Sequence, residues 1–138
     1  MALPSEVVDS PRVPRLGPYS QAVRVGDLVY TAGKPGIDPA SGAVAGDTFE
    51  AQARQAFANL AALLEDAGSS LARVIKVTCF ITDVAAFPTL NALFAEFFPE
   101  APPVRSAPTV QLPRGLLISI DAIAVVERPG HASTGTSS

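Results

Sequence analysis

The chain has 138 residues, which is enough for one domain with a single hydrophobic core and too few for two comfortable ones. Hydrophobic residues make up 48% of it and charged residues only 17%, so we expect part of the apolar surface to be buried between subunits. The formal net charge is −3, and no cluster of Lys or Arg occurs, which argues against nucleic acid as a partner.

The sequence predicts a cytoplasmic protein that does not bind a membrane. Residues 1–10 contain neither a basic region nor a continuous apolar one, and no later segment has the roughly 18 apolar residues of a membrane-spanning helix. The only cysteine, Cys79, has no partner for a disulfide within the chain, and its apolar neighbours favour a small buried residue.

The N-terminal third predicts an extended segment, a hairpin and a loop. Residues 1–13 are punctuated by prolines. Residues 21–25 and 28–31 flank Gly26-Asp27, a pattern typical of two antiparallel strands joined by a tight turn. Residues 33–42 are rich in turn formers and predict a loop.

A long helix is expected after this loop. Asp47 or Thr48 can cap its N-terminus, and Glu50 can complete a capping box with Asp47. Apolar residues then recur at helical spacing until Gly68, which predicts one amphipathic helix of about five turns.

The remaining elements are a strand, a second helix and two more strands. Residues 74–82 predict the strand, 86–98 the helix, which prolines end, and 106–112 and 116–127 the last two strands. The side chains expected on the apolar face of the first strand are Ile75, Val77, Cys79 and Ile81.

This order of elements predicts an α+β fold, a mostly antiparallel mixed sheet with both helices on one face. The other face of the sheet then needs a partner. We divide the chain into an extended segment 1–13, a folded domain 14–127 and a disordered tail 128–138. The only histidine, His131, lies in that tail, so we expect no histidine-dependent catalysis.

Arg105 is the first candidate for ligand binding. Pro102 and Pro103 stiffen the chain before it, and a predicted strand fixes the chain after it. A guanidinium held in this way can bind a carboxylate through two parallel hydrogen bonds, which suggests a small acidic metabolite as the ligand. The alternative is an arginine that pairs with an acidic residue at the surface.

Asp121 interrupts the most apolar predicted strand. A buried carboxylate is costly without a cation or hydrogen-bond donors, so this position implies either a fixed ion pair, with Lys76 or Arg105, or a functional site. Desolvation would raise its pKa and a nearby Arg105 would lower it, and both effects stay open at this point.

Three further residues have two interpretations each. Tyr19 follows Gly17-Pro18 and either packs against the domain or presents its phenol to a ligand. Asn91 lies among apolar residues of the second helix, where its amide either ties a loop or contacts a ligand. Gly33, at a strand end, either lets a ligand approach the backbone or supplies a turn.

The sequence lacks the residue patterns that several kinds of catalysis and cofactor binding require. The sequence has no Cys/His cluster for zinc, no glycine-rich phosphate loop, no dinucleotide fingerprint and no Ser/His/Asp set. We therefore expect chemistry that uses Arg, Asp, Tyr, backbone groups and water, with no metal and no cofactor.

Taken together, the motifs resemble the RidA/YjgF family of reactive-intermediate deaminases, also described as endoribonuclease L-PSP proteins. The match covers residues 14–127, with the motifs in order and at compatible spacing. The segments that carry it are Gly17-Pro18-Tyr19-Ser20-Gln21-Ala22, Tyr30-Thr31-Ala32-Gly33, Gln52 with Asn59-Leu60, residues 77–83, Phe87 with Asn91, Phe97-Phe98, Arg105-Ser106 and residues 118–124.

The resemblance implies a chorismate-mutase-like α+β subunit that forms a homotrimer with clefts between its subunits. It also implies a hydrolase without metal or cofactor, which converts enamines and imines such as 2-aminoacrylate or 2-iminobutanoate into a 2-keto acid and ammonia.

The same resemblance assigns roles to individual residues. Arg105 would hold the substrate carboxylate, and Asp121 would orient a water molecule or exchange protons with the amine nitrogen. Tyr19, from the neighbouring subunit, would contact the ligand, with Asn91 supporting the cleft and Gly33 exposing backbone groups. Ala107 would line the substrate site.

Three positions depart from the family pattern. Ala32 stands where Ser is common, Ala107 where Cys is frequent, and Asp121 where Glu is common. The shorter carboxylate would be withdrawn by roughly an ångström, a displacement that can lower a rate about a hundredfold. A protein that binds carboxylate metabolites without catalysis therefore remains an alternative, as does an enzyme that uses the same cleft for another imine step. Ribonuclease activity has little support in a chain of net charge −3.

Overall fold

The computed structural model describes residues 5–127 of the chain. The predictions for the tail 128–138, with His131, fall outside these residues. In chain order, the elements are β1 (Ser5–Val8), β2 (Ala22–Val25), β3 (Leu28–Thr31), β4 (Lys34–Pro35), α1 (Phe49–Asp66), the 3-10 turn η1 (Leu71–Arg73), β5 (Val74–Ile81), the 3-10 turn η2 (Val84–Ala86), α2 (Phe87–Phe97), β6 (Val104–Ser106) and β7 (Ile118–Val125).

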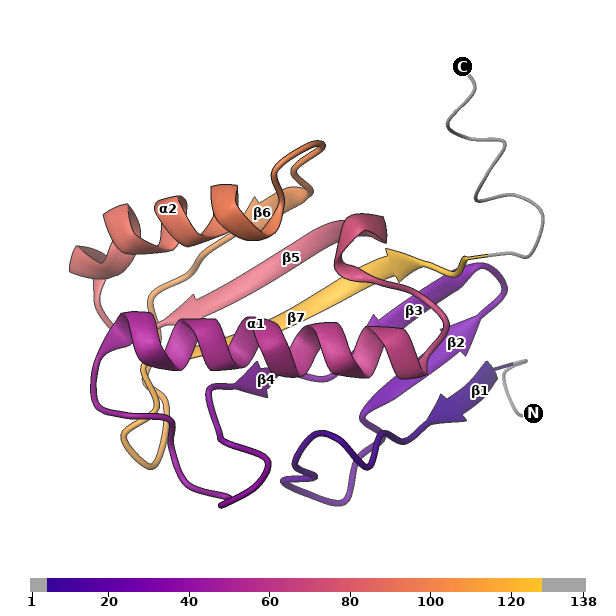
Figure 1. The fold of residues 1–138 in the computed structure, drawn as a ribbon, viewed down its shortest axis with the longest axis horizontal. Helices are drawn as coiled ribbons and strands as arrows, with labels where there is room; N and C mark the ends of the chain where they lie inside the picture. Colours follow the sequence, from indigo (N-terminus) through magenta and orange to yellow (C-terminus); the bar gives the residue numbers. More distant parts are fainter. Residues whose placement is uncertain (1–4, 128–138) are drawn as a thin grey trace.

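The strands form one mixed sheet in the order β1-β2-β3-β7-β5-β6, with the short β4 also paired to β7. Among the described residues, β5 and β6 form the parallel pair and the other strand pairs are antiparallel. Both helices lie on the same side of the sheet (Figure 1). The predicted α+β architecture is therefore confirmed. None of the helices within residues 5–127 is long and apolar enough to span a membrane.

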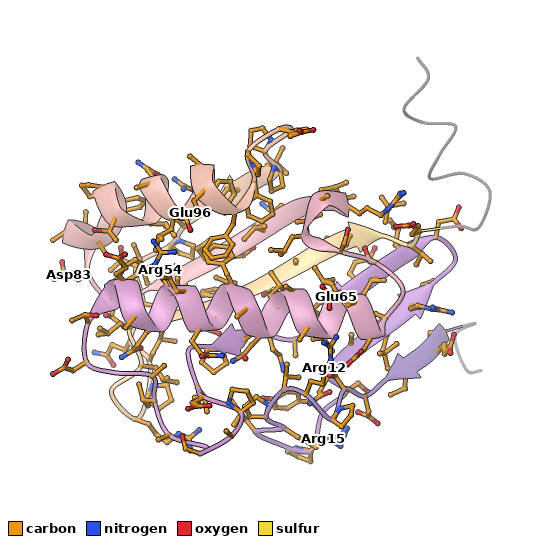
Figure 2. All side chains as sticks on the ribbon, viewed as in Figure 1. Arg12, Arg15, Arg54, Glu65, Asp83 and Glu96 are labelled. Carbon is orange, nitrogen blue, oxygen red and sulfur yellow. The ribbon has the colours of Figure 1, made fainter. Side chains whose placement is uncertain are left out.

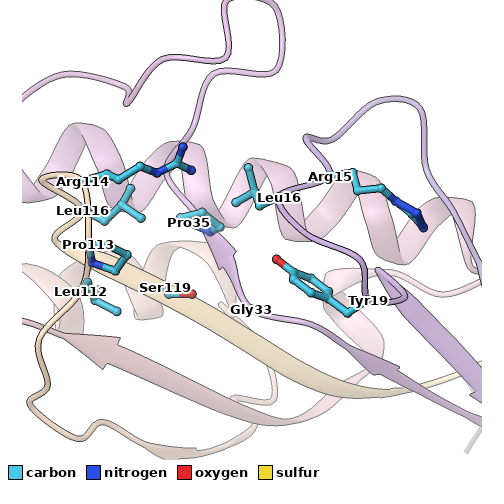
Figure 3. A pocket seen from close by; sticks show the side chains of 10 residues that line it. All are labelled: Arg15, Leu16, Tyr19, Gly33, Pro35, Leu112, Pro113, Arg114, Leu116 and Ser119. Atoms are coloured by element: carbon cyan, nitrogen blue, oxygen red, sulfur yellow. The ribbon is translucent and has the colours of Figure 1, made fainter.

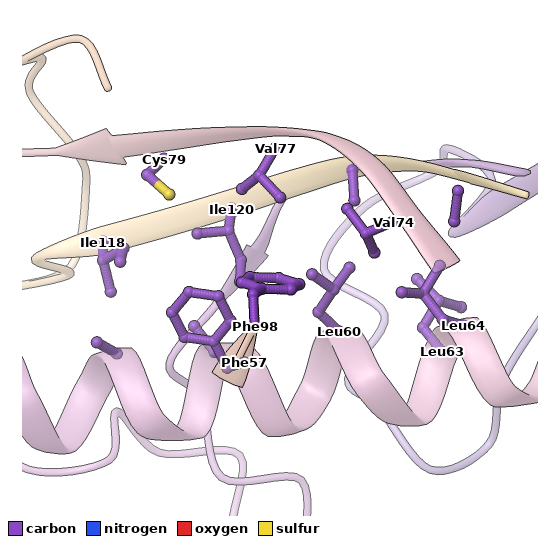
Figure 4. Packing of buried hydrophobic residues seen from close by; sticks show 14 of the residues in the cluster. Phe57, Leu60, Leu63, Leu64, Val74, Val77, Cys79, Phe98, Ile118 and Ile120 are labelled. Carbon is purple, nitrogen blue, oxygen red and sulfur yellow. The ribbon is translucent and has the colours of Figure 1, made fainter. Parts of the chain in front are cut away.

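The core lies between the two helices and the sheet, and Figure 4 shows the part of it between α1 and strands β5 and β7. Phe57, Leu60 and Leu64 of α1 are fully buried, as are Val77 of β5 and Ile120 of β7. This inward stripe arises because apolar residues recur every three or four positions along α1. The fully buried Cys79 fits the expected small hydrophobic role, and burial raises the pKa of its thiol to about 12.

Local interactions fix the two helices. Thr48 caps α1, since its Oγ1 accepts a hydrogen bond from the Ala51 N–H at 3.2 Å, so the second of the two predicted caps is the one used. The Phe57 ring of α1 stacks on the Phe97 ring of α2 with 4.7 Å between centroids. On the outer surface, Arg54 of α1 bridges to Glu96 of α2 at 2.7 Å (Figure 2).

The sheet differs from the prediction at both of its edges. Residues 5–8, inside the segment expected to be merely extended, form the edge strand β1, and the expected loop 33–42 contains β4. The prediction of a strand over residues 106–112 is wrong: β6 covers Val104–Ser106, and an irregular segment follows. Pro108 and Pro113 explain this difference, because proline has no N–H for a strand ladder.

One side chain of β5 faces the opposite way to the prediction. A register shift lies between Val74 and Lys76, so that Val74 is buried and Ile75 is 46% exposed. Such a bulge inserts a residue and reverses the alternation on one side of it. Val77, Cys79 and Ile81 keep the predicted buried face.

Candidate functional site

Arg105 is the middle residue of β6, the last strand at one edge of the sheet. It pairs with Val77, whose side chain faces the helices, and its guanidinium carbon lies 5.1 Å from the centroid of the Phe94 ring in α2. This cation–π contact holds a half-buried guanidinium against the helix layer at the edge of the sheet.

The guanidinium of Arg105 has no anionic partner within residues 5–127. Five other arginines of this region form ion pairs, and Arg105 and Arg114 are the two that do not. Within the described residues, the side chain of Arg105 also makes no hydrogen bond. The alternative of an arginine paired with a surface acid is therefore wrong for this region, and the N–H groups are available to a ligand.

Asp121 lies on the opposite face of the sheet from the helices. Its neighbours in β7, Ile120 and Ala122, are buried toward the helices, and Asp121 itself is half-buried opposite Thr78 of β5. Desolvation raises its pKa, while a hydrogen bond from Thr78 and the charge of Lys76 act in the lowering direction. Of the two effects left open by the sequence, burial raises the pKa as expected, whereas Arg105 is not among the groups that lower it.

The ion pair considered for Asp121 does not form within residues 5–127. Neither Lys76 nor Arg105 bonds to its carboxylate, and the Nζ of Lys76 instead donates to the Oγ of Ser106 at 2.9 Å. Asp121 is therefore a carboxylate with a raised pKa on the sheet face that the helices leave uncovered.

Tyr19 and Gly33 line a single cavity of about 700 Å³ (Figure 3). The cavity lies between the loop before β2, the segment entering β4, and the turn that leads into β7. Its lining residues are Arg15, Leu16, Tyr19, Gly33, Pro35, Leu112, Pro113, Arg114, Leu116 and Ser119. The phenol of Tyr19 is directed into this space in Figure 3, and the residue is 44% exposed. Its exposure fits the ligand-contact interpretation of Tyr19 better than the packing interpretation.

Two glycines shape this wall of the cavity. A Cβ on Gly17 would lie 2.6 Å from the Cε2 of Tyr19, so the missing side chain lets the Tyr19 ring lie against the backbone. A Cβ on Gly33 would lie 2.7 Å from the Oγ of Ser119, so Gly33 is required by the close approach of β7. The packing of β4 against β7 within the subunit thus explains why a glycine stands at position 33, and Gly33 also borders the open cavity.

Asn91 and Ala107 lie away from this cavity. Asn91 is exposed on α2 rather than enclosed by its apolar neighbours, and its side chain ties no loop within the described residues. Ala107 follows β6 and packs against the core. The helical repeat turns Asn91 outward, although Leu90 and Leu93 beside it face inward.

One protomer therefore brings together only some of the candidate residues. Tyr19 and Gly33 share the cavity, Arg105 lies at the β6 edge, and Asp121 lies on the uncovered face. Sequence reasoning missed Ser119 and Arg114 of the cavity wall. Ser119 had the same signal as Asp121, a polar residue in an apolar strand, and both lie on the same face of β7. No group of His, Cys, Asp or Glu within residues 5–127 is arranged to hold a metal ion.

The chain is similar to proteins of one family. The family model described as endoribonuclease L-PSP matches residues 10–126. A 2-iminobutanoate/2-iminopropanoate deaminase of Salmonella typhimurium is 43% identical over 114 residues, which cover 80% of this chain and 88% of that protein. A RutC family protein of Pyrococcus horikoshii is 42% identical over 124 residues, which cover 88% of this chain and 98% of that protein. The crystal structure of E. coli TdcF with bound serine matches with a TM-score of 0.81 and 34% identity, over 88% of this chain and 99% of that one.

Proposed function

Because the chain belongs to the endoribonuclease L-PSP family, the RidA/YjgF family that its motifs resemble, we propose that it is a deaminase of 2-imino and 2-enamino acids. Its products would be a 2-keto acid and ammonia. Relatives named 2-iminobutanoate/2-iminopropanoate deaminase, at 36% to 43% identity, support this class of reaction.

The observation that carries the proposal is the unpartnered guanidinium of Arg105. A half-buried cation without an acid beside it is costly unless a ligand supplies the negative charge. The substrate carboxylate would do so through two charge-assisted hydrogen bonds. The TdcF structure contains serine, which also bears a carboxylate next to a carbon–nitrogen bond.

The complete site is proposed to form between protomers of a homotrimer. In one protomer, Arg105 at the β6 edge does not line the cavity of Tyr19 and Gly33, so a second protomer would have to bring the two together. The sheet strands also present exposed apolar side chains, including Tyr30 at 41%, Ile75 at 46% and Val104 at 65%. Burial of such side chains favours association.

In the proposed reaction, Arg105 fixes the carboxylate and thereby the adjacent imine carbon. A water oxygen adds to this carbon, and Asp121 accepts a proton from the water and passes it to the nitrogen. The carbinolamine that results has a hydroxyl and an amino group. Asp121 then moves the hydroxyl proton to the nitrogen, the carbon–nitrogen bond breaks, ammonia leaves, and the keto group forms without any change of oxidation state. Asp121 suits both transfers because desolvation raises its pKa. Tyr19 would contact the ligand from the neighbouring subunit, with Gly33, Asn91 and Ala107 lining the cleft.

The proposal is tested by measuring ammonia released while 2-aminoacrylate or 2-iminobutanoate is generated in situ. Catalysis predicts release faster than in buffer, in proportion to the concentration of the protein, from a species whose mass in solution is that of a trimer. Release at the buffer rate would refute the deaminase function, and a monomeric active species would refute the shared cleft.

A non-catalytic carboxylate-binding protein is the second candidate. The short side chain of Asp121 and the apolar Ala32 and Ala107 favour it, since each removes a contact that the family pattern supplies. Calorimetric titration with 2-oxobutanoate distinguishes the two: binding without accelerated imine hydrolysis would identify a binding protein.

A further inference from the structure

The cavity of Tyr19 and Gly33 contains one cation that no acid neutralises. Of its two arginines, Arg15 bonds to Asp9 through its Nη2 at 2.5 Å, and its guanidinium is directed away from the cavity (Figure 3). Arg114 has no ion pair and no side-chain hydrogen bond within residues 5–127. No acidic residue lines the cavity. The free charge of this wall therefore belongs to Arg114.

The backbone does not favour arginine at this position. The N–H of Leu116 donates to the Pro113 carbonyl at 3.1 Å, and the two residues between them, Arg114 and Gly115, have φ of 60° and 73°. A turn with two left-handed central residues favours Asn, Asp or Gly at the first of them. Arg114 is the one non-glycine residue with positive φ among the described residues. Local turn chemistry thus gives no reason for this side chain.

The turn is also firmly attached to the domain. The buried amide of Gln52 donates to the Gly115 carbonyl at 3.2 Å and accepts from the Leu117 N–H at 2.8 Å. Gln52 is only 1% exposed. The base of the Arg114 side chain is therefore fixed at the rim of the cavity, and less motion has to be restricted when the guanidinium binds an anion.

The other groups that line the cavity are apolar side chains and hydroxyl groups. Leu16, Pro35 and Leu116 are apolar, and Tyr19 and Ser119 supply hydroxyl groups. A volume of about 700 Å³ leaves room for a second charged group beyond a four-carbon acid. A ligand with an apolar middle and a negative group at its far end fits this distribution of groups.

We propose that Arg114 binds a second carboxylate of the substrate, at the end opposite to the carboxylate that Arg105 holds. The preferred substrates are then 2-imino diacids, the imines that correspond to dicarboxylic amino acids. This inference rests on the proposed deaminase function for the imine, but the second anion site is an independent property of the cavity.

The test compares 2-iminoglutarate with 2-iminobutanoate, both generated in situ, on the full-length protein and on Arg114→Asn. Asparagine removes the charge and is favoured in the left-handed conformation, so the fold is retained. We expect kcat/KM for 2-iminoglutarate to fall about tenfold, the effect of one charged hydrogen bond, and kcat/KM for 2-iminobutanoate to stay within about twofold. Arg73→Asn, which removes a surface partner of Glu127, is the matched control and should change neither value.

Equal effects on both substrates, or no effect on either, would overturn the assignment of Arg114. If the protein hydrolyses neither imine, the deaminase proposal fails by itself, and calorimetric binding of 2-oxoglutarate and 2-oxobutanoate then decides about the site. Tighter binding of 2-oxoglutarate that Arg114→Asn abolishes would support the second carboxylate site. Equal affinities for the two keto acids would refute it.

Discussion

Replacing Arg105 by alanine is the most direct test of how the site recognises its substrate. The side chain contributes two things in the structure: a cation–π contact with Phe94 and N–H donors without an acceptor. The first stabilises the fold by about 0.5 to 1 kcal/mol at a partly exposed position. The donors, by contrast, act only when a ligand is bound, so activity should fall far more than stability.

The size of the effect follows from the hydrogen bonds lost. Two bonds to a carboxylate, each contributing about 1.5 kcal/mol at the low end for a charged pair, give about 3 kcal/mol. We therefore expect Arg105→Ala to lower kcat/KM for 2-iminobutanoate by about 150-fold. Arg105→Lys keeps the charge but not the planar fork, so a loss of about tenfold is expected.

The assay is ammonia release at substrate concentrations below KM, together with the unfolding midpoint and the mass in solution for each variant. Arg73→Ala is the control, because Arg73 forms a surface ion pair with Glu127 and lies outside the proposed site. If Arg105→Ala hydrolyses the imine at the parental rate, or loses activity only in proportion to lost folded protein, carboxylate binding by Arg105 is refuted.

Three other predictions concern the groups around the site. Because burial raises the pKa of Asp121, the folded protein binds this proton more tightly than the unfolded chain does. The stability of the protein therefore falls as the pH rises from the pKa of Asp121 in the unfolded chain to its higher pKa in the folded one. Asp121→Asn should therefore raise the melting temperature at neutral pH and not at strongly acidic pH, where a gain of equal size would contradict the assignment. The hydroxyl of Thr78 lowers the pKa of Asp121, so Thr78→Val should raise this pKa and shift the acid limb of kcat/KM to higher pH. Thr78→Ser keeps the hydroxyl and should leave the acid limb at its original pH. Gly33→Ala places a Cβ 2.7 Å from the Ser119 Oγ and should destabilise the fold by about 1 kcal/mol in urea unfolding. The added Ser119→Ala should recover that loss, and no recovery would mean that the contact is not its cause.

The parts of the fold that the sequence predicted well are those with local causes. The helix α1 follows from its cap at Thr48 and from its apolar repeat, and the hairpin of β2 and β3 follows from the turn at Gly26-Asp27. Strands β1 and β4 have no such local signal, because each exists through pairing with a strand distant in sequence. The outward position of Ile75 likewise depends on the register between β5 and β7.

The candidate site shows the same division between residue identity and placement. Sequence patterns made Arg105 and Asp121 candidates, because a fixed guanidinium and a carboxylate in an apolar strand are unusual in themselves. They did not predict that the parallel register of β6 with Val77 turns Arg105 toward Phe94, while Asp121 faces the opposite side of the sheet. In the proposed mechanism, the carboxylate ligand of Arg105 and the proton carrier Asp121 therefore have to meet in a cleft that one protomer alone does not form. Since Arg105 does not line the cavity of Tyr19 and Gly33, a second copy of the chain is the proposed source of the missing wall. A charged side chain introduced at an apolar position of the uncovered sheet face should therefore abolish both trimer formation and imine hydrolysis.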